Sequence, residues 1–437
     1  MAPIHPTPAG PATETDEALL DRFQRAAFGY FVEAFNATNG LIADTTRPGA
    51  PASIAVIGFA LAAYPVGVER GWMARDEAAA RALTTLRFFW SAPQNAGPDA
   101  TGHQGFFYHF LDMATGARVW RCELSMIDTA LLVAGMLTAA AYFTRQTPAE
   151  IGIRTLADAI YRRVDWSWAQ AGEATVRQGW KPRSGFLHYG WEGYSEAILL
   201  YALGLSSPTH PLSDASYAGW TQTYQWENIY DQDLLYAGPL FIHLYSHAWI
   251  DFAGLRDDFM REKHSDYFEN TRRAMLVQRE YARRNPHGYL GYDEDGWGLT
   301  ASDGPGYKIL SVGGRRRRFF SYAARGVPYG PDDGTLAPWA PLAALPFAPD
   351  LALRALRQLG ARHPLVVEDS RLPSGFNPTL TQDDPGGWIS EGYFGLDQGI
   401  VALMVENHRS GLIWRLMRDS PYLGPGLRRA GFRGGWL

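Results

Sequence analysis

Apolar residues recur along most of the chain at the three- and four-residue spacing of an amphipathic helix, whereas the strict alternation of a half-buried strand is scarce. The pattern therefore predicts an all-α protein with about a dozen helices. Asp16, Thr147-Pro148 and Pro349-Asp350 supply residue types that favour helix starts. The predicted helices span residues 16–35, 52–64, 75–90, 126–144, 148–166, 195–205, 234–252, 265–284, 337–344, 349–359 and 398–418.

No linker or shift in composition divides the chain, so residues 16–437 are predicted to form a single domain after a disordered leader at residues 1–15, which is rich in Pro, Ala and Thr. Long loops at 102–120, 180–193, 291–307 and 372–396 carry many Gly, Trp, Tyr and Asp residues, and long ordered loops usually carry function. Helices with such loops at one end fit an (α/α)6 barrel, or toroid. A multi-helix array with an open groove is the alternative.

Composition and charge narrow the class of protein. Hydrophobic residues make up 46% of the 437 positions and charged residues 19%, which is typical of a folded globular protein. The net charge of -5 gives no field that would attract nucleic acid or anionic lipid. The basic run Arg315 to Arg318 is interpreted as a solvated loop. No nucleic-acid or membrane partner is expected, and the oligomeric state stays open.

Cys122 is the only cysteine, which excludes an intramolecular disulfide and a cysteine metal cluster. The longest apolar run, 127–143, is too short to be a convincing membrane span. The beginning of the chain lacks the basic start and apolar core of a secretory signal. We expect a cytoplasmic protein, or a periplasmic one if a leader was removed from a longer natural chain.

Glu196 is the first candidate for chemistry, because it follows Trp191 and Tyr194 at the start of a strongly apolar helix. A carboxyl group beside aromatic rings loses hydration, which raises its pKa and lets it act as a general acid near neutral pH. The alternative is that Glu196 only stabilises the first turn of the helix through the helix dipole.

Glu123 and Asp128 form a second acidic cluster, at the start of the helix predicted for 126–144. They either project into a central cavity or complement the helix dipole. Asp397 follows Trp388 and stands at the start of the helix predicted for 398–418, where an N-cap role competes with a catalytic one. Asp383 and Asp384 are rival catalytic candidates.

His243 and His247 are four residues apart, the spacing at which two helical histidines can bind a metal. Because no HExxH pattern accompanies them, a hydrogen-bonded helix face is the favoured interpretation. The segment 293–307 resembles a calcium loop at its start but lacks the closing Glu. We interpret it as a sugar-contacting loop, with Trp297 stacking on a ring and Asp303 accepting hydrogen bonds.

Aromatic residues account for 14% of the chain, and many of them lie in the long loops. Pyranose rings stack on aromatic side chains, so this composition suits a glycan cleft. The competing interpretation is that the rings simply fill the core.

Taken together, the motifs resemble the glucoamylase-like proteins grouped around glycoside hydrolase family 144, the bacterial β-1,2-glucan hydrolases, and the resemblance spans nearly the whole chain. The motifs that carry it are Ala52-Ser53-Ile54-Ala55, Gly58-Phe59, Glu69-Arg70-Gly71-Trp72, Leu83-Thr84-Thr85-Leu86, Ile127-Asp128-Thr129-Ala130-Leu131-Leu132, Gly193-Tyr194-Ser195-Glu196, Ser207-Pro208-Thr209-His210-Pro211, Trp249-Ile250-Asp251-Phe252, Trp297-Gly298-Leu299-Thr300-Ala301-Ser302-Asp303-Gly304-Pro305, Leu396-Asp397-Gln398-Gly399 and Glu406-Asn407.

The resemblance implies an (α/α)6 barrel that cleaves β-1,2-linked glucan with inversion at the anomeric carbon and without a metal or organic cofactor. It places the general acid at Glu196 and the general base at Asp397, with Asp383 or Asp384 as the alternative base. The expected substrate contacts are Glu123, Asp128, Tyr194, Trp191, His243, His247, Trp297, Asp303 and Trp388. A cyclising β-1,2-glucanotransferase and a non-catalytic glycan-binding barrel are the alternative functions.

Overall fold

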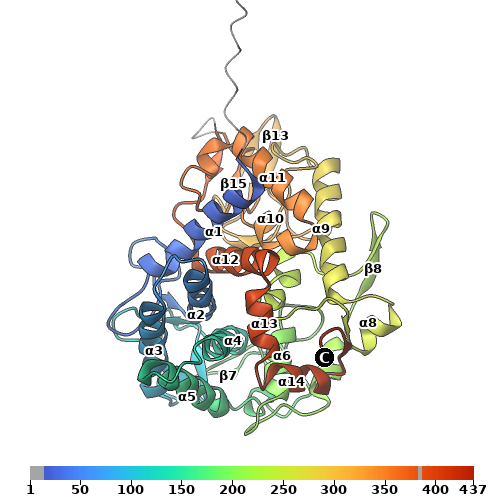
Figure 1. Ribbon diagram of the computed structural model, residues 1–437. Coiled ribbons are helices and arrows are strands. Elements are labelled where there is room, and N and C mark those ends of the chain that lie inside the picture. Colours follow the sequence, from blue (N-terminus) through green and yellow to red (C-terminus); the bar gives the residue numbers. More distant parts are fainter. Residues whose placement is uncertain (1–13, 382–385) are drawn as a thin grey trace, which may run out of the picture.

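The computed structural model describes residues 14–381 and 386–437, and it is mostly helical (Figure 1). Nearly all of the expected leader, together with Asp383 and Asp384, lies outside the described residues. The α-helices are α1 (Asp16–Glu33), α2 (Ile54–Glu69), α3 (Arg75–Ser91), α4 (Met126–Tyr142), α5 (Pro148–Arg163), α6 (Ile198–Leu205), α7 (Ser216–Thr221), α8 (Asp258–Glu262), α9 (Tyr267–Arg284), α10 (Ala340–Ala343), α11 (Pro349–Arg362), α12 (Gly395–Arg409), α13 (Leu412–Arg418) and α14 (Leu423–Arg429). Short 3₁₀ helices are η1 (Trp168–Gln170), η2 (Leu240–His243), η3 (Tyr245–Ala248), η4 (Leu345–Phe347) and η5 (Pro364–Val366).

The helices divide into an inner and an outer set. Helices α2, α4, α6 and α12 are buried over most of their surfaces, as their almost continuously apolar sequences require. Helices α5, α9 and α11 are amphipathic and bury one face only. In Figure 1, α3, α5, α9 and α11 lie toward the outside, whereas α2, α4, α12 and α13 lie nearer the centre.

The closest packing between inner helices depends on two glycines. A Cβ atom on Gly58 of α2 would lie 2.3 Å from the carbonyl oxygen of Leu131 on α4, and one on Gly135 would lie 2.0 Å from the carbonyl oxygen of Gly58. Any side chain at either position would push α2 and α4 apart. The two glycines therefore allow α2 and α4 to pack at this short distance.

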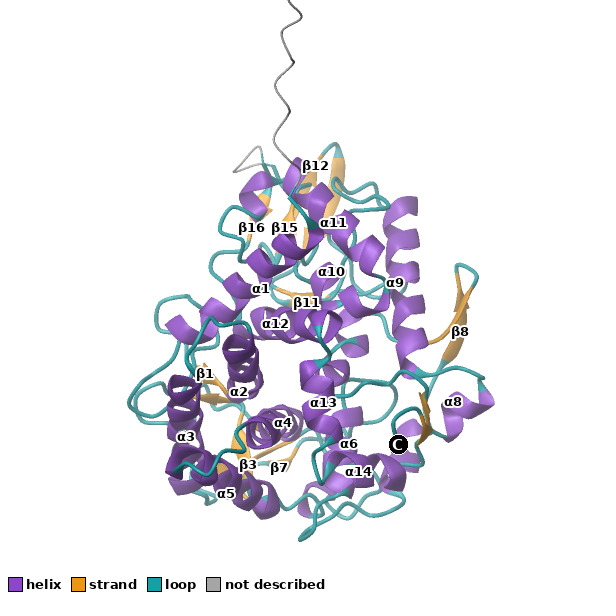
Figure 2. Ribbon diagram, viewed as in Figure 1, coloured by secondary structure: helices purple, strands orange, loops and turns teal. Residues whose placement is uncertain are grey.

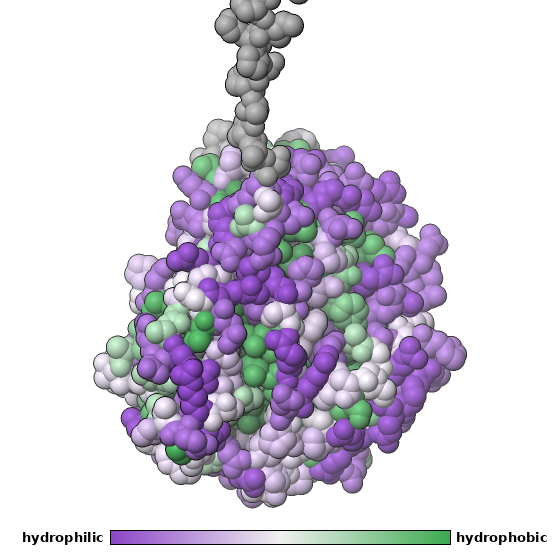
Figure 3. Space-filling view, in the orientation of Figure 1, coloured by the Kyte–Doolittle hydropathy of each residue, from purple (hydrophilic) through white to green (hydrophobic). Residues whose placement is uncertain are grey.

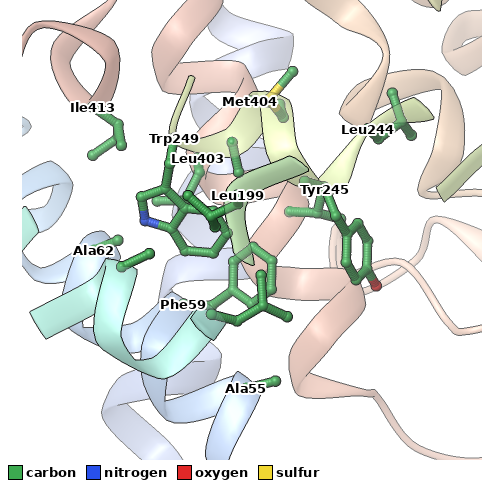
Figure 4. Packing of buried hydrophobic residues seen from close by; sticks show 14 of the residues in the cluster. Ala55, Phe59, Ala62, Leu199, Leu244, Tyr245, Trp249, Leu403, Met404 and Ile413 are labelled. Atoms are coloured by element: carbon green, nitrogen blue, oxygen red, sulfur yellow. The ribbon is translucent and has the colours of Figure 1, made fainter. Parts of the chain in front are cut away.

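Aromatic rings fill the core where α2, η3 and α12 meet (Figure 4). The ring centroids of Phe59 and Trp249 are 4.9 Å apart, and that of Tyr245 is 5.7 Å from Phe59 in an edge-to-face arrangement. In Figure 4 the hydroxyl of Tyr245 points away from this cluster. Tyr245 therefore belongs both to the core and to the cavity described below.

The strands are short and lie among the loops (Figure 2). They are β1 (Ala52–Ser53), β2 (Gly102–His103), β3 (Phe106–Tyr108), β4 (Phe110–Leu111), β5 (Leu124–Ser125), β6 (Gly179–Lys181), β7 (Gly185–Phe186), β8 (Trp226–Ile229), β9 (Gln232–Leu235), β10 (Leu255–Arg256), β11 (Ala301–Ser302), β12 (Lys308–Val312), β13 (Arg315–Phe319), β14 (Ala323–Ala324), β15 (Phe376–Asn377), β16 (Trp388–Ile389) and β17 (Arg433–Gly434). An antiparallel sheet has the order β2-β3-β5-β6-β7, and β1 pairs with β4. Because β1 runs directly into α2 and β5 directly into α4, these strands hold the N-terminal ends of two inner helices together.

Two long predicted helices are wrong in the structure. The segment 234–252 contains the end of β9 followed by η2 and η3, because Gly238-Pro239 interrupts the helical pattern. The segment 398–418 is divided into α12 and α13 at Gly411, whose φ of 69° ends the first helix. The short helices α7, α8 and α14 were missed, because five to seven residues show too little periodicity.

The basic run Arg315 to Arg318 is also not a loop but part of strand β13, which pairs with β12 in a hairpin. The turn is Gly313-Gly314, with φ angles of 60° and 73°, the combination that favours a two-residue hairpin. The visible face of the molecule is mostly hydrophilic (Figure 3). Among the described residues, no helix is both long and apolar enough to span a membrane.

Candidate active site

A cavity of about 660 Å³ opens beside the N-terminal ends of α4 and α12, the loop between α1 and α2 and the loop before α6. This volume lies within the range of about 300–1,000 Å³ that is typical of ligand sites. Five carboxylates from separate parts of the chain line it: Asp44, Glu123, Asp128, Glu196 and Asp303. The inner helices bring their starting loops to one place, so acids that are far apart in sequence face one space.

Glu196 stands two residues before α6, in the wall of the cavity. Burial, together with the negative charge of Asp128, raises the pKa of its carboxyl group to about 7, although a backbone hydrogen bond partly offsets the rise. Its backbone carbonyl accepts a hydrogen bond of 2.6 Å from the Ser246 hydroxyl, which fixes the loop against η3. At neutral pH Glu196 therefore holds its proton much of the time and can donate it.

Asp397 lies in the first turn of α12, directly after the cavity-lining residue Leu396, but it does not itself belong to the described lining. The side chain is buried, and its Oδ2 atom has no hydrogen-bond partner within the described protein. Burial raises the pKa well above that of an ordinary aspartate, an effect that the Ser374 hydroxyl only partly offsets. An unpaired buried oxygen costs about 1–3 kcal/mol, and such exceptions are often functional.

His109 links two acids on the opposite part of the lining. Its Nδ1 atom lies 2.9 Å from Glu123 Oε1, and its Nε2 atom lies 3.6 Å from Asp128 Oδ2. Desolvation lowers the His109 pKa, but Asp128, Glu123 and Asp44 outweigh it and raise the pKa to about 9. The hydrogen bond from the imidazolium lowers the pKa of Glu123 to about 2. This part of the cavity therefore carries fixed negative charges around one cation.

Asp44 faces the same charges from the loop between α1 and α2. Burial and the negative charge of Asp128 raise its pKa to about 6, and the cations of His109 and Arg47 only partly offset the rise. Asp44 therefore ionises within one to two pH units of neutrality, unlike Glu123. Asp44 and Glu123, which both interact with His109, thus differ in how firmly they hold a proton.

Asp303 is held by partners from two other loops. It forms an ion pair with the Arg47 guanidinium and accepts a 2.8 Å hydrogen bond from the Ser390 hydroxyl. Arg47 also donates to the backbone carbonyl of Glu391 and lies over the ring of Phe394. These contacts connect the loops around residues 47, 303 and 390 at the cavity wall.

Aromatic side chains cover much of the remaining lining. They are Phe110, Trp191, Phe241, Tyr245, Tyr322 and Phe394. Carboxylates that bind hydroxyl groups, together with rings that stack on apolar faces, match the surface of a sugar chain. The predicted site residues Glu123, Asp128, Trp191, Glu196 and Asp303 meet in this cavity.

Four other predicted contacts lie outside the cavity lining. Tyr194 packs edge-to-face on His243 at a centroid distance of 5.1 Å, in a buried group of rings. His243 hydrogen-bonds the Ala237 carbonyl and His247 bonds the Thr271 hydroxyl, and burial lowers their pKa values to about 4 and about 3. Trp297 is buried and contributes to a different, much smaller pocket, next to α11. The tyrosine and the tryptophan carry no charge, and the two histidines are neutral at neutral pH because their pKa values are lowered. The protein interior can therefore accommodate all four side chains.

Trp388 lies in β16, which pairs with β15, and it too is outside the described cavity lining. Among the residues that the structure describes, no group of three or more His, Cys, Asp or Glu side chains is arranged to hold a metal ion. The His243/His247 pair accordingly has no third ligand within that part of the chain.

Sequence reasoning missed Asp44, Arg47, His109 and Tyr322, all of which line the cavity. His109 lies inside the long loop 102–120, which was predicted to carry function. A histidine in such a loop is a candidate site residue, because its pKa lies close to neutral pH. Asp44 and Arg47 lie in the loop between the first two helices. An acidic and a cationic side chain three residues apart were the only local indication of their role. Tyr322 follows the basic run Arg315 to Arg318, which was interpreted as a solvated loop without a function.

Comparison with known proteins assigns this chain to a family. Residues 188–421 match the family described as "Putative glucoamylase". A solved structure from Bacteroides uniformis, described as a "putative glucoamylase", is 30% identical and superposes with a TM-score of 0.86, covering 97% of this chain and 99% of its own. An endo-β-1,2-glucanase from Chitinophaga pinensis, solved with sophorotriose and glucose, is 25% identical with a TM-score of 0.84, covering 97% and 100% of the two chains.

An exo-β-1,2-glucooligosaccharide sophorohydrolase from Parabacteroides distasonis is 28% identical over 95% of this chain. The present chain spans 58% of the length of that relative. The match extends beyond the cavity to the full set of helices, since the solved relatives cover nearly all of both chains. The chain therefore belongs to the glucoamylase-like family that carries the description "Putative glucoamylase", and bacterial β-1,2-glucan hydrolases are among its homologues.

Proposed function

We propose that this protein is a glycoside hydrolase that cleaves β-1,2-linked glucan with inversion at the anomeric carbon, on an (α/α)6 barrel. The observation that carries the proposal is Glu196, an acid with a pKa of about 7 in a cavity lined by carboxylates and aromatic rings. Cleavage of a glucan requires a group that donates a proton near neutral pH, and binding of the glucan is favoured by carboxylates that accept hydrogen bonds from its hydroxyl groups. This cavity offers both. The names of the homologues supply the linkage.

In the proposed reaction Glu196 donates its proton toward the oxygen of the leaving sugar. The C–O bond to the leaving group breaks as the anomeric carbon takes on positive character. Glu123 is ionised, because the His109 cation lowers its pKa, and it remains available to accept hydrogen bonds from sugar hydroxyls. Asp303, oriented by Arg47 and Ser390, accepts hydrogen bonds from hydroxyl groups of another part of the glucan.

We assign the general base to Asp397, which activates the water that attacks the opposite face of the sugar ring. Its unpaired Oδ2 atom provides an acceptor for a water or a substrate hydroxyl. A hydrogen bond to that oxygen stabilises the ionised form and lowers the pKa, so ligand binding would convert a protonated acid into a base. Inverting pairs ordinarily leave room for the water at a separation of about 6.5–9.5 Å. Asp383 and Asp384 remain the rival bases.

Incubation of the purified protein with linear β-1,2-glucan tests the proposal, with products resolved by size, linkage and anomeric configuration. Short linear products of inverted configuration, lost in Glu196→Gln but retained in Glu192→Gln, are the expected result. Glu192 is an exposed acid in the same loop, so it is the matched control. Cyclic or lengthened products would point to a glucanotransferase, and binding without any products would point to a glycan-binding barrel.

A second experiment identifies the base. Asp397→Asn, Asp383→Asn and Asp384→Asn are assayed with added azide, a small nucleophile that substitutes for an activated water. The variant that loses activity by about 10²–10⁴-fold and regains it with azide lacks the base. Rescue of Asp383→Asn or Asp384→Asn, and not of Asp397→Asn, would overturn the assignment.

A further inference from the structure

The turn at residues 118–122 presents Trp120 to solvent. Trp120 is 69% exposed, although tryptophan is among the residues that gain most from burial. Trp120 and Arg121 have φ angles of 55° and 50°, in the left-handed region that strains residues other than glycine. Two strained residues in succession hold an indole that buries only about a third of its surface, and local strain of this kind is concentrated at functional sites.

The turn is fixed to strand β4 and is not a free loop tip. The Val119 N–H donates to the Phe110 carbonyl at 3.1 Å, and the Cys122 N–H donates to the Val119 carbonyl at 3.1 Å. The Phe110 N–H in turn donates to Cys122 Sγ at 3.3 Å. The position of the indole is therefore determined before any ligand binds, which limits the entropy lost on binding.

A continuous series of rings connects Trp120 to the cavity. Trp120 lies 5.1 Å from Phe110 between ring centroids, and Phe110 stacks on His109 at 3.9 Å with an interplanar angle of 13°. Phe110 and His109 both line the cavity, whereas Trp120 does not. The apolar face at Phe110 therefore continues outward onto the exposed indole.

We propose that Trp120 is a sugar-stacking subsite outside the cavity, which binds a glucose ring of a long glucan chain whose remainder lies in the cavity. A pyranose offers an apolar C–H face to an exposed aromatic ring, and the site needs no change of backbone to accept it. The inference rests on the proposed function for the identity of the sugar. It adds that the protein favours substrates long enough to reach from Glu196 to Trp120.

The test compares long linear β-1,2-glucan with the shortest oligosaccharide that the native enzyme cleaves. In Trp120→Ala, kcat/KM for the long chain is expected to fall about five- to tenfold through KM, and the value for the short substrate is unchanged. Trp120→Phe keeps a ring and restores most of the loss. Trp90→Ala is the matched control, since Trp90 is 45% exposed at the end of α3 and does not line the cavity.

Binding measured by calorimetry separates the subsite from the chemistry. Glu196→Gln and the double variant Glu196→Gln/Trp120→Ala are titrated with the same two ligands, and only the long chain is expected to lose affinity. Equal losses for both lengths, or no loss for either, overturn the subsite while the proposed function stands. Binding that depends on Trp120 in a native protein that releases no sugar overturns the proposed function while the subsite stands. Absence of binding to either ligand overturns both.

Discussion

Carboxyl groups in two regions at or beside the cavity have opposite pKa shifts. Near the start of α4, Glu123 hydrogen-bonds a histidine cation, and its pKa falls to about 2. Near the starts of α6 and α12, Glu196 and Asp397 have no cationic partner that offsets their burial, and their pKa values rise. The difference comes from whether a positive charge accompanies the carboxylate out of water.

Under the proposed function, this contrast separates substrate binding from proton transfer. An acid with a fixed negative charge orients hydroxyl groups at every pH of interest but has no proton to give. An acid that is only desolvated keeps its proton near neutral pH and is therefore suited to donate it. Pairs of carboxylates whose surroundings push their pKa values apart are the general arrangement for acid–base catalysis.

The largest expected effect comes from Glu196→Gln, which keeps the shape of the side chain and removes the transferable proton. The value of kcat should fall by about 10²–10⁴-fold, the usual contribution of a general acid. Initial rates of reducing-sugar release from β-1,2-glucan measure it, with Glu192→Gln as the matched control. A loss below about tenfold would exclude Glu196 as the acid.

The pH dependence sharpens the same comparison. Because Glu196 must be protonated and its pKa is about 7, kcat/KM should fall about tenfold per pH unit above that value. Asp128→Asn removes a negative charge that raises the Glu196 pKa, so the falling limb should move to lower pH. Profiles of kcat/KM from pH 4 to 10 test this, and an unshifted limb in Asp128→Asn would contradict the coupling.

His109→Asn removes the charged hydrogen bond that holds Glu123 and should lower kcat/KM about tenfold, since such a bond contributes about 1.5 kcal/mol or more. The His109 pKa is about 9 against an ordinary 6.5, so its stabilisation is complete below pH 6.5 and is lost as the pH rises through 9. The Glu123 pKa is about 2 against 4.5, so its stabilisation is present above pH 4.5 and is lost toward pH 2.

The Tm difference between native protein and His109→Asn should therefore be largest between pH 4.5 and 6.5 and should disappear above pH 9. Melting curves across this range measure it. His103→Asn is the control, because this histidine of β2 stacks on Trp180 and its pKa is lowered by desolvation. A Tm difference that does not change with pH would show that His109 acts through packing alone.

The smallest effect is expected for the stability of Asp397→Asn. An aspartate with a raised pKa makes the folded state less stable as the pH rises above 3.8, because the unfolded chain ionises more readily. Asparagine does not ionise, so the variant should melt at a slightly higher temperature than the native protein at pH 7 and at the same temperature at pH 3. Asp350→Asn, in the exposed first turn of α11, is the control and should show no such gain.

Helices that are long and uninterrupted could be predicted well from sequence. The predicted helix 16–35 corresponds to α1, the one at 75–90 to α3 and the one at 265–284 to α9, within about two residues at each end. The errors occur where a short-range signal interrupts a long apolar pattern, as at Gly238-Pro239 and Gly411. Gly313-Gly314 was a hairpin signal that the four adjacent arginines obscured.

For the site, the sequence identified the acids but not their surroundings. Glu196, Glu123, Asp128 and Asp303 could be selected because acids beside aromatic residues at helix starts form a local pattern. Trp297 and the histidines of 243–247 fit the same local criteria, yet they pack in the interior, since burial is not a local property.

The sequence by itself determined the mostly helical class, the family and the candidate acids of the site, because periodicity and motifs are local. Only the tertiary structure decided which acids share a cavity and which charge accompanies each of them. His109 is fourteen residues from Glu123 and nineteen from Asp128, and Arg47 is 256 residues from Asp303. Electrostatic effects depend on distance in space and on exclusion from water, and both are set by how the inner helices pack.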